Sequence, residues 1–408
     1  MPQARRSILR TPPDSHGGPD KQAEPRYDFS VNSNPFGPPA ALLSHLQHCE
    51  LQRYPDPHCY AAKQAAVAYH RQHPASTGQE LTAANIVFGN GSAELIYRIA
   101  ACYALPQRRV VVASPSFGEY ARASSLYGAK VFPVRVYHPQ DVNSHSVDSQ
   151  DVDSHGVNSQ SAGSQSADAR GIDVAALRRA IAQYRPALVW LCQPNNPSGQ
   201  AWPADALADI AACCEAADAL LVLDAAYYDL GQLSMPLPAN CVQLWSLTKT
   251  YCIPGLRVAY AIASAEVAAV LERAAPPWQT SSHAQAAACW SFGTEAAAFR
   301  QQSIPALHAL TASLKVSFKN DMQALGMRLW PSVTPYFLLE VGDASRCKAS
   351  AYQAGLRLRD CSSFGLPRWV RLATQQPEAN AALLEWQRQY FNRTLGHALN
   401  NHRLDGAP

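Results

Sequence analysis

The chain has 408 residues, enough for one large domain with a sizeable core and a smaller domain beside it. Hydrophobic residues make up 47% and charged residues 16%, and a formal net charge of +3 is too small to indicate nucleic acid or an acidic membrane as a partner. No apolar run reaches the roughly 18–20 residues of a membrane-spanning helix, and no apolar segment typical of a signal peptide follows the N-terminal arginines. Eleven cysteines without a C-x-x-C pair favour reduced thiols, so we expect a cytoplasmic protein.

Short β-rich runs alternate with helical stretches from about residue 85 onward. The runs cover residues 85–89, 109–114, 130–136, 187–194, 219–224, 242–246 and 256–262. Those before residue 256 are mostly apolar throughout, as expected of strands that are covered on both faces. Helical stretches such as 93–104, 173–183 and 203–217 separate most of them. This alternation predicts an α/β domain with a mostly parallel, doubly wound sheet.

A degenerate five-residue repeat interrupts this pattern at residues 141–170. It begins D-V-N-S-H and contains almost no large apolar side chains, so it buries too little surface to offset the entropy of ordering. We interpret it as a disordered surface insertion rather than a pentapeptide solenoid. His145 and His155 lie within it and are not expected to bind a metal, and we expect no metal site elsewhere.

The C-terminal part has a different pattern. Beyond about residue 300, a long helical stretch leads to short strands and closing helices, which predicts a smaller α+β domain. The short strands are expected at residues 327–330, 337–341, 356–359 and 369–373. The predicted division is an N-terminal arm at 1–50 that joins the small domain, a large domain at 51–295 and a small domain at 296–408.

The strongest chemical signal is S-L-T-K-T-Y-C-I-P-G-L-R, which starts at Ser246, the last residue of an apolar run, and places Lys249 just after that run. Lys249 lies among hydroxyls, and a lysine that forms a Schiff base must be partly desolvated so that its amine can be neutral. Ser246, Thr248 and Arg257 would supply the hydroxyl and guanidinium donors that a phosphate needs. Taken alone, Lys249 could equally be a surface lysine after a strand.

Two further strings follow apolar runs. In L-V-L-D-A-A-Y, Asp224 ends a run, where a carboxylate caps a turn or pairs with a buried cation. In Q-P-N-N-P-S-G, Asn196 could donate a hydrogen bond to a ligand, although the string by itself is simply a turn.

Two strings nearer the N-terminus also follow apolar runs. G-N-G-S-A-E-L-I starts at Gly89 and opens a helix whose free amides could bind an anion. P-S-F-G-E-Y places Phe117 just after a run, where it could stack on a cofactor or pack in the core. All these strings lie at the carboxyl ends of predicted strands, where ligands bind in open α/β sheets.

The order of these motifs resembles fold-type-I pyridoxal-phosphate (PLP) enzymes, and specifically their histidinol-phosphate aminotransferase branch. Four further strings resemble the threonine-phosphate decarboxylases of cobalamin biosynthesis. They are H-G-G from His16, Y-D-F-S-V-N-S-N-P-F-G-P-P from Tyr27, Y-P-D-P from Tyr54, and L-R-D-C-S-S-F from Leu358 followed by R-L-A at Arg371. The resemblance implies the aspartate-aminotransferase-like fold and PLP as the cofactor.

The resemblance also implies roles for individual residues. Lys249 would carry the cofactor, Asp224 would pair with its pyridine nitrogen, and Phe117 would stack on its ring. The expected partners of the phenolic oxygen are Asn196 and Tyr227, and those of the cofactor phosphate are Ser92, Ala93, Ser246, Thr248 and Arg257. Tyr54 would reach the phosphate in the neighbouring subunit, which implies a homodimer.

On the substrate side, Asn32 and Arg371 would hold a carboxylate, while His16 and Arg359 would face a phosphate. Simpler readings remain open: a turn at Tyr54 or Asn32, a disordered arm at His16, and surface ion pairs at the two arginines.

The resemblance implies decarboxylation of L-threonine O-3-phosphate to (R)-1-amino-2-propanol O-2-phosphate. The alternative is an aminotransferase acting on histidinol phosphate or a related amino acid. A third reading, the ligand-binding domain of a regulator, would require a DNA-binding module, and the sequence offers neither a helix-turn-helix segment nor a basic stretch.

Overall fold

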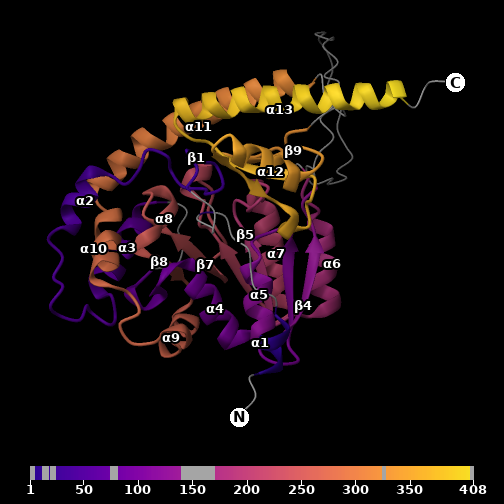
Figure 1. Cartoon of the computed structure of the whole chain (residues 1–408). Helices are drawn as coiled ribbons and strands as arrows, with labels where there is room; N and C mark the ends of the chain where they lie inside the picture. Colours follow the sequence, from indigo (N-terminus) through magenta and orange to yellow (C-terminus); the bar gives the residue numbers. More distant parts are fainter. Residues whose placement is uncertain are drawn as a thin grey trace, which may run out of the picture.

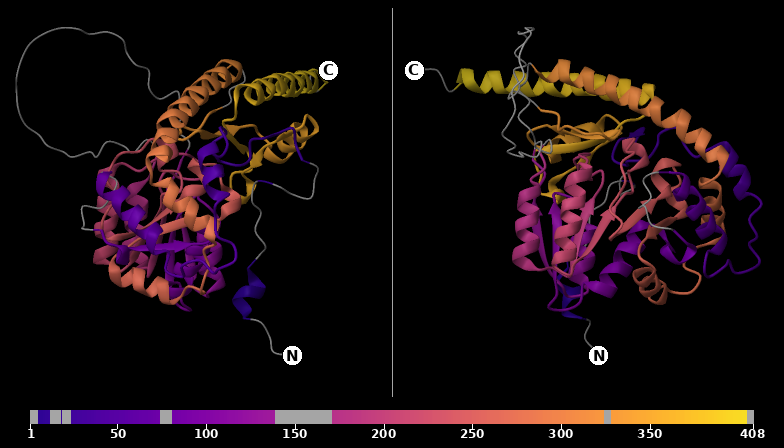
Figure 2. Two further views of the ribbon diagram at one scale, coloured as in Figure 1. Left: turned by 90° about the vertical axis from the view of Figure 1, so that its left-hand side faces the viewer. Right: turned by 180° about the vertical axis from the view of Figure 1, so that it is seen from behind.

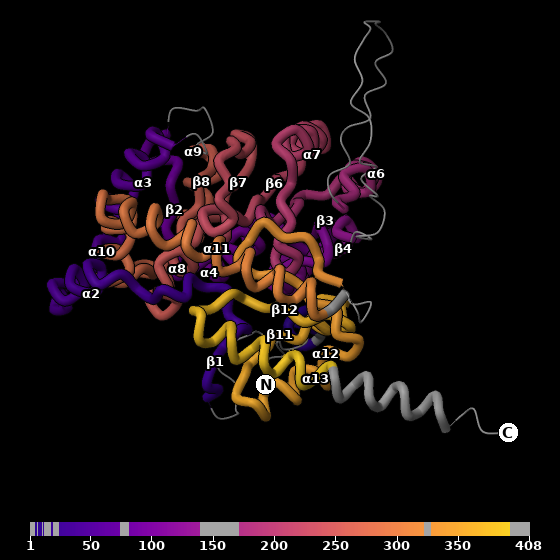
Figure 3. Tube along the Cα trace, turned by 90° about the horizontal axis from the view of Figure 1, so that it is seen from above, coloured from indigo at the N-terminus to yellow at the C-terminus, as the bar shows by residue number. Residues whose placement is uncertain are grey.

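The computed structural model describes residues 5–11, 18, 24–73, 81–138, 171–323 and 328–404. A large unit is built on a seven-stranded sheet, and a smaller unit with the long helices α11 (Thr294–Gln323) and α13 (Pro377–Leu404) lies at one end of it (Figure 1). Seen from above, α11 and α13 cross the small unit side by side (Figure 3). Within these residues, no helix is both long and apolar enough to cross a membrane.

The large sheet has the strand order β2-β8-β7-β6-β5-β3-β4. Its strands are β2 (Ile86–Gly89), β3 (Arg109–Ser114), β4 (Lys130–Arg135), β5 (Leu188–Cys192), β6 (Leu220–Asp224), β7 (Cys241–Ser246) and β8 (Ala259–Ile262). The strands from β7 to β4 are parallel, while β8 runs antiparallel to both β7 and β2. The carboxyl ends of β2, β3, β5, β6 and β7 therefore share one edge of the sheet.

Helices cover both faces of this sheet, which explains why its central strands are apolar throughout. One face packs on α4 (Gly91–Tyr103), α5 (Glu119–Leu126) and α9 (Ala265–Arg273). The opposite face packs on α3 (Tyr60–Gln72), α6 (Val174–Tyr184), α7 (Ala204–Ala216) and α10 (Ser282–Ser291). Figure 2 shows these layers from two further sides.

Side-chain caps fix several helix starts. The Asp173 carboxylate accepts from the backbone N–H of Ala176 at 2.8 Å and begins α6, and Ser264 and Ser281 cap α9 and α10 in the same way. Such caps satisfy N–H groups that have no partner inside the helix.

The small unit packs a three-stranded sheet against helices. The sheet has the order β11-β12-β9, formed by β11 (Arg359–Asp360), β12 (Trp369–Ala373) and β9 (Tyr336–Glu340). Its core also includes side chains from α11, α12 (Ala344–Gln353) and α13.

The N-terminal segment contacts both units. The strand β1 (Tyr27–Asp28) pairs in parallel with β10 (Leu356–Arg357) of the small unit. The helix α2 (Ala40–Leu46) contacts α10 of the large unit, and the short α1 (Arg6–Arg10) contacts α5.

The structure confirms the predicted α/β class and corrects three details. The strand expected at 327–330 is wrong, since residues 328–330 contribute only an isolated bridge at Leu329. The run expected at 356–359 is split between two sheets as β10 and β11, because Leu356 and Arg359 pair with different partners. The strand expected from residue 256 starts at Ala259, after a turn in which Arg257 has a φ of 51°. The insertion at 141–170 lies outside the described residues.

Candidate active site

A cavity of about 310 Å³ lies between the carboxyl edge of the large sheet and the small unit. Its lining residues are Ser30, Val31, Asn32, Ala93, Phe117, Gly118, Asn196, Tyr227, Lys249, Arg257, Arg359, Ser363, Phe364 and Arg371. Nine of these were expected at the site from the sequence. Those that follow strands of the large sheet come together because these strands direct their following turns to the same edge. Asn32, Arg359 and Arg371 reach the cavity from the N-terminal segment and the small unit instead.

Lys249 lies in the one-turn helix α8 (Leu247–Thr250), directly after β7. Burial, followed by the nearby cations Arg371 and Arg257, lowers the pKa of Lys249 to about 8. The backbone around it is held by Asn34, which donates from its N–H to the Lys249 carbonyl at 2.9 Å and from Nδ2 to the Thr250 carbonyl at 3.1 Å. The backbone at Lys249 is thus held in place, and the amine loses its proton more readily than that of an ordinary lysine.

Asp224 ends β6 just behind the cavity. Burial raises the pKa of its carboxyl, but two donors favour the ionised form: the Tyr120 hydroxyl at 2.6 Å and the Ala226 N–H at 3.0 Å. Tyr120 itself is wedged against Trp190, with ring centroids 5.1 Å apart. Tyr120 was not among the site residues predicted from the sequence, although it ends the P-S-F-G-E-Y string.

The turn between β2 and α4 faces Arg257. Gly91 has a φ of 80°, and a Cβ there would clash with the Arg257 guanidinium. Ala93 lines the cavity, while Ser92 precedes it in α4. The Ser246 and Thr248 hydroxyls are hydrogen-bonded to each other at 2.8 Å, so these two side chains lie together beside Lys249 without lining the cavity.

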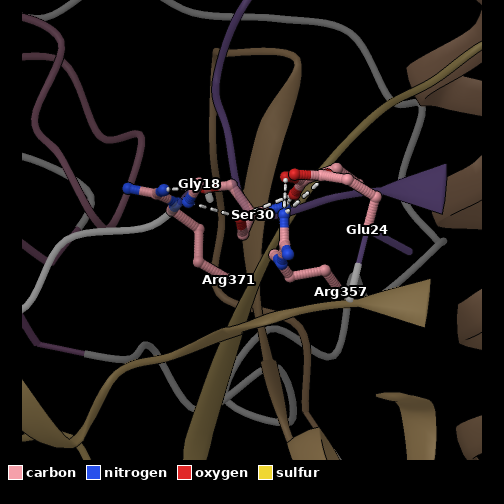
Figure 4. Close-up of polar contacts among 6 residues, drawn as sticks. Gly18, Glu24, Ser30, Arg357 and Arg371 are labelled. Atoms are coloured by element: carbon pink, nitrogen blue, oxygen red, sulfur yellow. Dashed lines mark hydrogen bonds and ion pairs between the residues drawn. The ribbon is translucent and has the colours of Figure 1, made fainter. Parts of the chain in front are cut away.

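Arg371 reaches the cavity from β12. Its Nη2 donates to the Ser30 carbonyl at 2.6 Å, and its Nη1 donates to Oδ1 of Asn196. These are contacts with the N-terminal segment and the large sheet, and not the surface ion pair left open by the sequence. Figure 4 shows Arg371 and Ser30 side by side, with Gly18 beside them.

Gly18 is the one described residue of the H-G-G string. It is buried, and its N–H donates to the Ser30 Oγ at 3.0 Å. Arg357 fixes the next part of the segment through Glu24 at 3.6 Å and Asp28 at 3.2 Å (Figure 4). His16 lies outside the described residues.

Arg359 is adjacent to Arg371. The two residues are Cα partners in the antiparallel pair β11-β12, so their side chains lie on the same face of that small sheet. Arg359 donates from Nη2 to the Ser363 Oγ at 2.8 Å and lies 5.2 Å from the Phe364 ring centroid. Asn32 is buried nearby, and neither of its side-chain polar atoms has a hydrogen-bond partner among the described residues. It therefore does not cap a turn.

Like Ser92, Asp224, Ser246 and Thr248, Tyr54 is an expected site residue that does not line the cavity. Its side chain is 78% exposed and stacks on Trp278, with ring centroids 4.6 Å apart. The sequence also missed five lining residues: Ser30, Val31, Gly118, Ser363 and Phe364. All five lie within the Y-D-F-S-V-N, P-S-F-G-E-Y and L-R-D-C-S-S-F strings, so closeness to a motif is the signal that could have found them.

The site fits PLP. A readily neutral lysine, a carboxylate behind it and an aromatic ring, Phe117, lie around one cavity. A glycine turn and the Arg257 guanidinium beside it provide a place for a phosphate, and the Asn32 amide, which has no hydrogen-bond partner among the described residues, lines the same cavity.

Comparisons with known proteins agree with this chemistry. The family model "Aminotransferase class I and II" matches residues 25–385. The chain is 26% identical over 368 residues to a histidinol-phosphate aminotransferase of Thermoanaerobacter sp. (strain X514), covering 88% of this chain and 91% of that protein.

Solved structures show the same fold. Histidinol-phosphate aminotransferase from Sinorhizobium meliloti in complex with pyridoxal-5'-phosphate superposes with a TM-score of 0.71 at 19% identity, covering 91% of this chain and 92% of that one. L-threonine-O-3-phosphate decarboxylase from Porphyromonas gingivalis superposes with a TM-score of 0.68 at 22% identity, covering 90% and 99%. The predicted aspartate-aminotransferase-like fold is confirmed. The chain belongs to the class I and II aminotransferase family and is a PLP-dependent enzyme.

Proposed function

We propose that this enzyme acts on a small amino acid that carries both a carboxylate and a phosphate, and that it decarboxylates L-threonine O-3-phosphate. The observation that carries the proposal is the pair Arg359 and Arg371, which are in register on adjacent strands and line the same cavity as Lys249. Two guanidiniums at one site suit a substrate with two anionic groups, because each can bind a carboxylate or phosphate through parallel hydrogen bonds.

The cofactor-binding residues are those that surround the cavity edge. Lys249 would carry PLP, Asp224 would pair with the ring nitrogen and Phe117 would stack on the ring. Asn196 and Tyr227 would contact the phenolic oxygen. The residues that would bind the phosphate are Ser92, Ala93, Ser246, Thr248 and Arg257.

When bound, PLP would supply an electron sink that weakens one of the bonds to the Cα of the substrate. The chain selects that bond by holding the substituents. Arg371 and Asn32 grip the carboxylate, and Arg359 grips the phosphate, with His16 reaching it from the arm. Lys249, with its lowered pKa of about 8, returns a proton to Cα after CO2 leaves.

A contact between the N-terminal arm and Ser30 supports the decarboxylase proposal. Gly18, in the H-G-G string, donates to Ser30, whose carbonyl accepts from Arg371. The arm is therefore linked to the proposed carboxylate-binding residue, which suits an enzyme that must fix the carboxylate direction.

The second candidate is amino transfer from histidinol phosphate to a 2-oxo acid, and the names of the relatives favour it. Histidinol phosphate has no carboxylate, so the two arginines would bind the donor's phosphate and the acceptor's carboxylates in separate half-reactions. Lys249 would then move the Cα proton.

One assay separates the candidates. The purified enzyme is incubated with L-threonine O-3-phosphate alone, and separately with histidinol phosphate and 2-oxoglutarate. The proposal expects CO2 from the first mixture without consumption of a 2-oxo acid. Glutamate formation in the second mixture, with threonine phosphate left intact, would establish the aminotransferase instead.

We also propose a homodimer in which Tyr54 contacts the cofactor phosphate of the other subunit. The exposed stack of Tyr54 on Trp278 supports this, because two large aromatic side chains on the surface are typical of a protein interface.

A further inference from the structure

A largely buried ion pair lies directly behind the turn that faces Arg257. Glu94, in the first turn of α4, is held by Arg98 one turn later. Arg98 donates from Nε to Oε1 at 2.8 Å and from Nη2 to Oε2 at 2.6 Å. The Arg98 residue is only 4% exposed.

The Glu94 carboxylate is built into the turn. Its Oε2 accepts from the backbone N–H of Asn90 at 3.2 Å. A Cβ on Gly89 would lie 2.5 Å from the same oxygen, so glycine is needed there for the carboxylate to fold back. The Glu94 side chain thus sets the path of the chain from Gly89 to Gly91, while the far side of Gly91 lies against Arg257.

The position of this carboxylate is electrostatically unfavourable for a phosphate site. The start of a helix attracts anions, and an unpaired carboxylate there would compete for the amides and repel a phosphate dianion. Arg98 removes that conflict with two charge-assisted hydrogen bonds. Its Nη1 also donates to the carbonyl of Phe88, the residue before the turn, at 3.4 Å.

We propose that Glu94 and Arg98 are positioning residues for the cofactor phosphate. Glu94 shapes the turn and Arg98 neutralises Glu94, so that the turn presents its amides and Arg257 without a competing negative charge. Neither side chain lines the cavity.

The test measures cofactor binding to the apoenzyme and needs no turnover. Dissociation constants for PLP and for pyridoxal, which lacks the phosphate, are obtained from the absorbance of the lysine-linked cofactor. The ratio of the two constants isolates the contribution of the phosphate. Because no substrate is involved, failure of this proposal leaves the proposed reaction untouched.

Arg98→Met is expected to weaken PLP binding about 10-fold or more and to leave pyridoxal binding within about 2-fold, since it leaves a partly buried carboxylate uncompensated. The double variant, Glu94→Gln combined with Arg98→Met, should return to within about 3-fold of the wild-type ratio, because the introduced amide is neutral and its oxygen can still accept from Asn90. Arg98→Lys keeps the charge and serves as the milder variant should Arg98→Met fold poorly; we expect a ratio change of about 3-fold.

Lys63→Met is the matched control. Lys63 joins α3 to α9 through Glu272 at 2.7 Å, with its side chain 11% exposed, so its loss removes a partly buried ion pair that does not line the cavity. This variant should lower the melting temperature and leave the PLP-to-pyridoxal ratio unchanged. Equal weakening of PLP and pyridoxal in the Arg98 variants would mean that the pair serves folding alone. A double variant no better than Arg98→Met would overturn the charge-compensation role.

Discussion

At the scale of single residues, the buried Lys249 lowers the stability of the folded protein, and its proposed role as the cofactor-carrying lysine explains why it is buried. Its pKa in the folded chain is about 8, against 10.5 for an ordinary lysine. Below pH 8 the folded protein must hold a buried ammonium near Arg371 and Arg257, which disfavours folding. Between pH 8 and 10.5 the unfolded chain binds more protons than the folded one, so stability rises with pH across that window.

Replacing this lysine should therefore stabilise the apoenzyme. The pKa difference of 10.5 − 8 = 2.5 means that the buried ammonium lowers the free energy of unfolding by at most about 3 kcal/mol. Lys249→Met should therefore raise the free energy of unfolding at pH 7 by part of this amount. The gain should shrink as the pH is raised from 8 towards 10. Urea denaturation of both apoproteins at pH 7 and pH 9.5 measures this difference in the free energy of unfolding. Equal stabilities at pH 7 would contradict the proposed destabilisation by Lys249.

A substitution at Arg371 tests whether this residue binds the substrate carboxylate. Its guanidinium is already held by Asn196 and Ser30, so it presents a fixed fork that a lysine cannot reproduce. Arg371→Lys should lower kcat/KM for the true substrate by a factor that corresponds to about 2–4 kcal/mol of lost transition-state stabilisation. Arg368→Lys is a suitable control, because Arg368 pairs with Glu340 and has a side chain that is 65% exposed. Similar values of kcat/KM for both variants would contradict the proposed role of Arg371 in binding the carboxylate.

At the scale of elements, the turns after the strands hold the two units together. Gly199, after β5, has a φ of 70°, and its carbonyl accepts from the Val333 N–H at 2.9 Å. Nearby, the Tyr336 hydroxyl donates to the Asn195 carbonyl at 3.0 Å, and Trp330 donates to Gln200 at 2.7 Å. The loop that contains Asn196 is thus clamped between the large sheet and β9.

Gly199→Ala should disrupt this clamp. A Cβ there would clash with the Ser332 hydroxyl and lie 2.6 Å from Thr334 Oγ1, and the backbone is left-handed. The expected loss is about 2–4 kcal/mol of unfolding free energy. Gly37→Ala has a similar φ of 78° with no atom within 4 Å, so it should cost only about 1 kcal/mol. Equal losses in urea denaturation would show that the contact between the units is unimportant.

The insertion between β4 and α6 should be dispensable. On either side of it, Tyr137 and Ile172 form an antiparallel bridge, and the His138 N–H donates to the Gly171 carbonyl at 2.9 Å. The chain therefore leaves and returns at neighbouring positions. Deleting residues 142–169 should change the melting temperature by no more than about 2 °C and leave activity intact. If the deleted protein does not fold, the repeat packs against the domain after all.

At the scale of the whole molecule, the proposed dimer makes each site depend on both chains. Tyr54 lies outside its own cavity and is 78% exposed, so a role in catalysis requires a second subunit. A symmetric dimer would supply Tyr54 to each site from the opposite chain.

Mixing two inactive variants tests this arrangement. Lys249→Ala and Tyr54→Ala are unfolded and refolded together, so that hybrid dimers form. In a hybrid, one site carries both lesions and the other carries none, which should restore activity at about a quarter of all sites. The separately refolded variants are the controls, and sedimentation velocity reports the dimer itself. A mixture with no more activity than its components would exclude shared sites.

The α/β class, the central strands and the sheet edge that carries the site could all be predicted from the amino-acid sequence. Apolar runs mark β3, β5, β6 and β7 because both faces of these strands are covered by helices. Since parallel strands direct their turns to one edge, the motifs around Phe117, Asn196 and Lys249 were sufficient to predict one site.

The residues that close that site could not be predicted from local sequence patterns, because they meet through long-range packing. The Arg371 guanidinium meets Ser30 across 341 positions and Asn196 across 175 positions of the chain, and no local pattern specifies such a contact. The antiparallel direction of β8, the division of residues 356–359 between two sheets and the exposure of Tyr54 likewise depend on pairing partners distant in the sequence. Local periodicity encodes which face of an element is apolar, whereas the choice of neighbour is set by packing of the whole chain.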